Sequence, residues 1–143
     1  MTRTGPSKKV DATFWQGRRR TAWIYHAAAQ DTVGLADQST NCSPAVSNAI
    51  LAAIAYTDSV TAYKAQVVNQ QGHASASKLL RSVLGNAFPD AQERRIRRLL
   101  GRKDEVQYGV HAIGIDAARQ VIADLDAFAA WAHDVLPKAE SQS

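Results

Sequence analysis

The sequence has little cysteine and no long apolar run. Cys42 is the only cysteine among 143 residues, which excludes an intrachain disulfide and a cysteine-rich zinc site. The longest apolar run in the uncharged middle of the chain covers residues 49–56, too few to cross about 30 Å of hydrocarbon as a helix. The N-terminal segment also lacks the apolar core of a secretion signal. We therefore expect a cytoplasmic protein that does not interact with membranes.

Several enzyme motifs are absent from the sequence. It contains no glycine-rich phosphate loop, no HExxH zinc motif and no GxSxG nucleophile elbow. Its histidines are dispersed, and no two of them have the helical spacing that suits a shared metal: His26, His73, His111 and His133. We expect neither a metal nor a cofactor.

The composition favours helices. The chain has 26 alanines but only 8 glycines and 4 prolines, and alanine has the highest intrinsic helix propensity. Hydrophobic residues make up 45% and charged residues 21%, as in ordinary globular domains. The length suits one domain, which we place at residues 11–137. Residues 1–10 lack periodicity and are predicted to be disordered, and residues 138–143 are predicted to form a flexible tail.

The spacing of apolar residues and the positions of capping residues predict about five helices. Their expected ranges are 11–34, 43–68, 75–85, 90–109 and 115–137. No alternating strand pattern extends beyond a few residues. Since the connections are short, consecutive helices should pack side by side. The predicted fold is therefore all-α, an antiparallel up-and-down bundle.

The net charge of +4 conceals a segregation of charge along the chain. Residues 1–20 carry a net +5 and residues 78–103 a net +6, whereas residues 104–143 carry a net −5. The predicted helix 90–109 is therefore basic and the predicted helix 115–137 is acidic. A basic surface on one helix favours an acidic partner such as nucleic acid.

The basic helix carries a ridge of arginines. Arg94, Arg98 and Arg102 are four residues apart and should line one face, with Arg95 beside them. One interpretation pairs these arginines with acids of the last helix. The other is a phosphate-binding ridge that includes Lys103, because guanidinium groups bind phosphate in a bidentate manner. The acids available for the first interpretation are Asp124, Asp126 and Asp134.

Two charged residues fall within otherwise apolar helical stripes. Asp58 interrupts the middle of the second predicted helix, and Lys103 lies on the apolar stripe of the fourth. A buried charge needs a partner. An ion pair between Asp58 and Lys103 would satisfy both groups; alternatively, Asp58 lines a cleft at the end of the bundle.

Three segments together resemble the HEPN superfamily, whose helical domains occur in prokaryotic toxin–antitoxin, defence and nucleotidyltransferase-associated proteins. The segments are AVSNAILAAIAYTDSVTAYKAQ, GHASASKLLRSVLG and RRLLGRKDEVQYGVHAIGIDAARQVIADLDAFAAWAHDVL. The resemblance covers residues 12–136. It implies a HEPN-like helical bundle, a homodimer, and a cognate antitoxin or a nucleotidyltransferase-type protein as partner.

The resemblance also indicates where an active site would lie. Active ribonucleases of this family use an Arg followed four to six residues later by a His, presented at a dimer cleft. The matching positions here hold Lys103 and Tyr108, so the catalytic pair is degenerate. A tyrosine with a pKa near 10 is a poor proton carrier at neutral pH. A pair of the usual residue types would be Arg102 and His111, which are separated by a longer spacing.

Three functions are therefore open. The first is a non-catalytic HEPN-like protein that binds RNA, a nucleotide or a protein partner through the basic helix. The second is a divergent, metal-independent endoribonuclease toxin. The third is a purely structural helical protein whose charges are paired internally. The catalytic candidates for the second are Lys103, Tyr108, Asp58 and His111.

Overall fold

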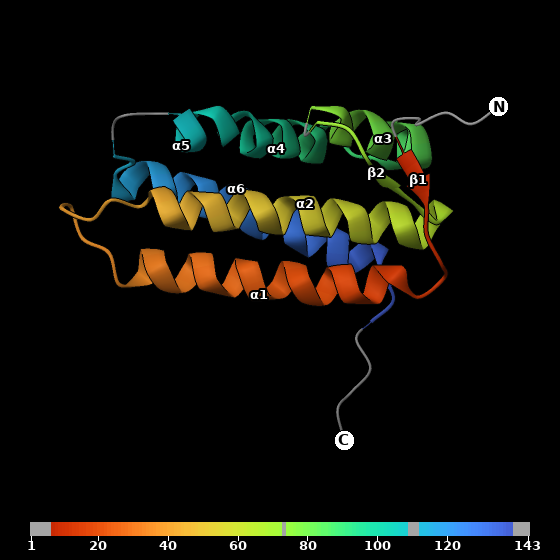
Figure 1. Ribbon diagram of the computed structural model, residues 1–143, viewed down its shortest axis with the longest axis horizontal. Coiled ribbons are helices and arrows are strands. Elements are labelled where there is room, and N and C mark those ends of the chain that lie inside the picture. The colour runs from red at the N-terminus through yellow and green to blue at the C-terminus, as the bar shows by residue number, and fades with distance from the viewer. Residues whose placement is uncertain (1–6, 73, 109–111, 139–143) are drawn as a thin grey trace, which may run out of the picture.

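The computed structural model describes residues 7–72, 74–108 and 112–138, and it confirms an all-α bundle (Figure 1). Short connections join consecutive helices, as the sequence predicts. The helices are α1 (Phe14–Gly34), α2 (Ser43–Ala65), α3 (Ser75–Leu84), α4 (Asp90–Gly101), α5 (Lys103–Tyr108) and α6 (Ile115–Val135), with a 3-10 turn at Gly85–Ala87. The strands are β1 (Ser7–Lys9) and β2 (Val67–Asn69).

Helix α2 forms the centre of the bundle. It packs against α1, α3, α4, α5 and α6, and it lies between α1 and α4 in Figure 1. Six of its alanines are almost completely buried, and these small side chains let neighbouring helices approach closely: Ala45, Ala49, Ala52, Ala53, Ala55 and Ala62. Helix α6 packs against both α2 and α4. None of the helices in the described ranges combines the length and the hydrophobicity that a membrane span requires.

The small sheet corrects two predictions. Ser7–Lys9, expected to be disordered, pair antiparallel with Val67–Asn69, of which Val67 and Val68 were expected to be helical. Helix α2 ends at Ala65 because Gln66 adopts a left-handed conformation with φ 53°, after which the chain extends. Val68 of β2 is only 4% exposed and belongs to the hydrophobic core. Strands of three residues are too short for an alternating pattern to predict them.

The predicted helix 90–109 is divided in two. Helix α4 ends at Gly101, and α5 begins at Lys103. Between them, the Arg102 amide donates to the Leu99 carbonyl at 3.3 Å, a tightening typical of a helix end. A glycine weakens a helix, which explains why the break falls here. Residues 1–6, 73, 109–111 and 139–143 lie outside the described part of the chain.

Candidate anion-binding site

A surface pocket of about 560 Å³ lies where the N-terminal end of α3 meets the junction of α4 and α5. Its lining contains three cations and a single acid. The lining residues are Gly72, Ala74, Ser77, Lys78, Arg97, Leu100, Gly101, Lys103 and Asp104. We name this the basic pocket.

The α3 end of the basic pocket is electropositive. The residue that precedes the helix is Ala74, whose methyl side chain cannot accept a hydrogen bond from the first amides of α3. The N-terminus of a helix carries a partial positive charge and amides that are available to an anion. Helix α3 therefore adds a backbone contribution to the charge of the side chains.

The two lysines of the basic pocket are not neutralised by described residues. In the described ranges, neither Lys78 nor Lys103 forms an ion pair or a hydrogen bond through its side chain. The predicted ion pair between Lys103 and Asp58 is wrong. Asp58 pairs with Arg18 at 3.1 Å, because the Asp58 side chain is directed toward α1 rather than toward α5.

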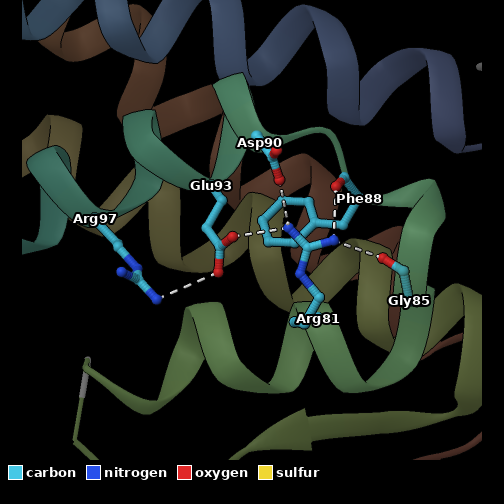
Figure 2. A network of polar contacts seen from close by, with 6 residues as sticks. All are labelled: Arg81, Gly85, Phe88, Asp90, Glu93 and Arg97. Atoms are coloured by element: carbon cyan, nitrogen blue, oxygen red, sulfur yellow. Dashed lines mark hydrogen bonds and ion pairs between the residues drawn. The ribbon is translucent and has the colours of Figure 1, made fainter.

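The third cation, Arg97, is held by a network of polar contacts at the corner between α3 and α4 (Figure 2). Arg81 donates to a Glu93 oxygen at 2.7 Å, and this hydrogen bond lowers the pKa of Glu93. The other Glu93 oxygen lies 3.4 Å from the Arg97 guanidinium, a longer and weaker contact. Glu93 is thus anchored by Arg81 and positions Arg97 at the pocket, and the Arg97 side chain is still 64% exposed.

The arginine ridge is neutralised only in part. Arg98 forms two hydrogen bonds with Asp124 of α6, at 2.8 and 3.1 Å, so this pairing with the acidic helix is confirmed. Arg102 pairs instead with Glu105, which is its close neighbour in α5. Arg94 and Arg95 form no ion pair with any other described residue. The remaining predicted acids do not bridge to the ridge within the described ranges: Asp126 and Asp134.

Asp58 borders a second, smaller cavity of about 140 Å³, together with Asn69 and Gln71. Its side chain is only 14% exposed, and burial raises its pKa to about 6 although Arg18 and Lys8 act in the opposite direction. The Nε atom of Arg18 is buried and has no described hydrogen-bond partner. The prediction that Asp58 needs a partner is therefore confirmed, with Arg18 as that partner.

A polar network that sequence patterns did not reveal joins α1, α2 and α6, and it runs from the buried Tyr56 to the exposed Asp126. The His26 ring lies 2.9 Å from the Tyr56 hydroxyl and 2.7 Å from an Asp126 carboxylate oxygen. Tyr56 is completely buried, which raises its pKa to about 12. The Tyr56 hydroxyl is out of reach of solvent and cannot contact a substrate, and the contacts of His26 join α1 to α2 and α6. The three residues are far apart in the sequence, and no spacing rule connects them.

Some candidate residues are not described by the structure. The Tyr108 side chain and all of His111 and His73 lie outside the described residues, so the pairs Lys103/Tyr108 and Arg102/His111 stay predictions. The sequence analysis did not identify Lys78 individually as a residue of the binding site, although it lines the basic pocket. The signal that could have identified it is its place at the start of the basic segment 78–103.

The arrangement of the basic pocket, three cations beside the open end of a helix, is suited to hold an anion such as a phosphate group. In comparisons with known proteins, no family model, no curated protein and no solved structure matches this chain.

Proposed function

We propose that the chain is a HEPN-like helical protein of toxin–antitoxin or defence type that binds RNA phosphates in the basic pocket without cleaving the RNA. The observation that carries the proposal is the convergence of Lys78, Arg97 and Lys103 on one pocket at the uncapped N-terminus of α3. The neutralisation of phosphate charges by lysine and arginine side chains is the main source of affinity in nucleic-acid binding.

The surface outside the pocket favours a polymer over a free nucleotide. Arg94 is exposed on α4, Arg95 is partly exposed, and neither is paired with another described residue. A mononucleotide would occupy the pocket alone, whereas the next phosphates of a strand could contact this second pair of cations. The resemblance of the α4–α6 segment to HEPN domains supports the same part of the molecule as the binding site.

The residues at the family's catalytic positions favour binding over cleavage. Lys103 can hold a phosphate as a point charge. Tyr108 occupies the position of the usual histidine, and a tyrosine, whose reference pKa is near 10, is a poor proton carrier at neutral pH. A divergent ribonuclease is therefore the second candidate, and the binding experiment must include an assay for cleavage.

The test is fluorescence anisotropy of a labelled single-stranded RNA, titrated at several salt concentrations. Three single variants remove one cation each: Lys78→Gln, Arg97→Gln and Lys103→Gln. Each should weaken binding by about 3–10-fold and lower the slope of log affinity against log salt concentration by about the contribution of one phosphate contact. Arg119→Gln is the matched control, because it removes an exposed cation from α6, outside the pocket, and should leave affinity nearly unchanged.

Two outcomes would contradict the proposal. Equal affinity of all three pocket variants and the wild type would mean that RNA, if bound, does not use the basic pocket. Cleavage of the RNA by the wild type, abolished in Lys103→Gln, would replace binding with the ribonuclease function.

A further inference from the structure

The basic pocket contains a polar side chain besides its charged residues, Ser77 in the first turn of α3. Ser77 is only 4% exposed, yet it lines the pocket. Its hydroxyl forms no hydrogen bond with another residue of the described ranges. A hydroxyl that is removed from water without a partner costs free energy, and an oxygen acceptor bound in the pocket would satisfy it.

The charges of the pocket lining match a doubly charged anion. The lining carries three positive charges and one negative charge, so its formal charge is +2: Lys78, Arg97, Lys103 and Asp104. The neighbouring acid Glu93 does not cancel this charge, because its closer partner is Arg81, at 2.7 Å (Figure 2). A phosphate monoester carries a charge of about −1.5 to −2 at pH 7 and three terminal oxygens. An internal phosphodiester carries a single negative charge on two such oxygens, so the monoester is the better match.

The shape of the site favours the end of a strand over its middle. The pocket has a volume of about 560 Å³, which is in the range of small-ligand sites, and its walls come from α3 on one side and from the α4–α5 junction on the other. An internal phosphate enters such a pocket only with a ribose on each side, whereas a terminal phosphate brings one. Arg94 is exposed on α4, three residues before Arg97 and on the same face of the helix. A strand that leaves the pocket along α4 would therefore meet Arg94 next.

We infer that the basic pocket binds the terminal phosphate monoester of an RNA strand, with its three cations around the dianion and the Ser77 hydroxyl donating to a terminal oxygen. The next phosphate of the strand lies against Arg94. The inference rests on the proposed function, because it names the part of the RNA that the pocket takes. A phosphate monoester is found at the 5′ end or at the 3′ end of a strand, and the test separates the two.

The test is fluorescence anisotropy with one short single-stranded RNA that carries its label on an internal base. The RNA is prepared in three forms, with a 5′-phosphate, with a 3′-phosphate, and with a hydroxyl at both ends. At least one phosphorylated form should bind the wild type about 5–20-fold more tightly than the hydroxyl-ended form, because it adds a charge-assisted contact. The preferred form identifies the end that the pocket recognises.

Four variants locate this preference in the pocket. Ser77→Ala and Lys78→Gln should each lower the ratio of the two affinities by about threefold or more. Arg94→Gln should weaken all three RNA forms by a similar factor and leave the ratio unchanged, because Arg94 contacts an internal phosphate. Arg119→Gln, on α6 and outside the pocket, is the matched control and should change neither the ratio nor the affinity. Circular dichroism checks the folding of Ser77→Ala, and Lys78 is exposed, so its substitution tests the pocket without disturbing the core.

The outcomes separate this inference from the proposed function. Equal binding of the three RNA forms, weakened in Lys78→Gln, would keep RNA binding in the pocket and overturn the inference. A preference for a phosphorylated end that both Ser77→Ala and Lys78→Gln retain would also overturn it, because the phosphate would then be recognised elsewhere. Failure of all three RNA forms to bind would overturn the proposed function and the inference together.

Discussion

Asp58 shows, at the scale of the residue, how far a sequence pattern can predict a buried charge. A carboxylate in an apolar stripe predicts a partner, and the structure supplies Arg18. The pattern could not choose between Arg18 and Lys103, because the choice depends on which neighbouring helix the side chain of α2 faces. Burial outweighs the attraction of Arg18, so the pKa of Asp58 is raised to about 6.

The raised pKa predicts a pH dependence of stability. The folded state holds the Asp58 proton more tightly than the unfolded chain does, so this contribution is fully present below about pH 4 and is lost as the pH rises through about 6. A shift of this size corresponds to at most about 3 kcal/mol. Urea unfolding at a series of pH values should show that Asp58→Asn removes this decrease in the free energy of unfolding.

The control for this prediction is Asp116→Asn, which changes an 84% exposed carboxylate and should preserve the wild-type pH profile. If the profiles of Asp58→Asn and the wild type were parallel from pH 4 to 6, Asp58 would not be the group responsible.

At the scale of the element, Arg81 joins α3 to α4. Its guanidinium donates to the carbonyl oxygens of Gly85 and Phe88, at 2.7 and 2.9 Å, and it lies over the Phe88 ring. We expect Arg81→Ala to lower the free energy of unfolding by about 1–3 kcal/mol, mainly through lost hydrogen bonds rather than through its exposed ion pair with Asp90. Arg81→Lys should not restore stability, because an ammonium group cannot reproduce the planar fork.

Chemical denaturation measures this effect, and Arg94→Ala is the control, because Arg94 is exposed and unpaired among the described residues. A change within about 0.5 kcal/mol is expected for that control. Equal effects of the two substitutions would show that the corner does not depend on Arg81.

Two glycines near the ends of helices should respond to alanine in opposite ways. Gly101 closes α4 without positive φ, and a Cβ there would meet nothing within 4 Å, so Gly101→Ala should stabilise the fold by about 0.5–1 kcal/mol. Gly85 follows α3 with φ 56°, a conformation that is strained for alanine, so Gly85→Ala should destabilise by about 1 kcal/mol or more. Thermal unfolding of both variants compares the signs directly, and the same sign for both would contradict this explanation.

The elements also show which parts of the fold were predictable. Alanine content and helical spacing predict α1, α2, α3 and α6 because each of these helices buries a face over several turns. The strands β1 and β2 have three residues each, and their pairing joins segments about sixty residues apart, so local patterns do not reveal it. The same limit applies to the His26 network, whose members come from three helices.

At the scale of the whole molecule, the segregation of charge is visible in the sequence but its consequence is not. The acidic helix does pack against the basic one, yet only Arg98 and Asp124 pair across them within the described ranges. The pocket itself depends on the N-terminus of α3 approaching the junction of α4 and α5. Sequence patterns therefore predicted Lys103 and the basic segment, but not the enclosing geometry.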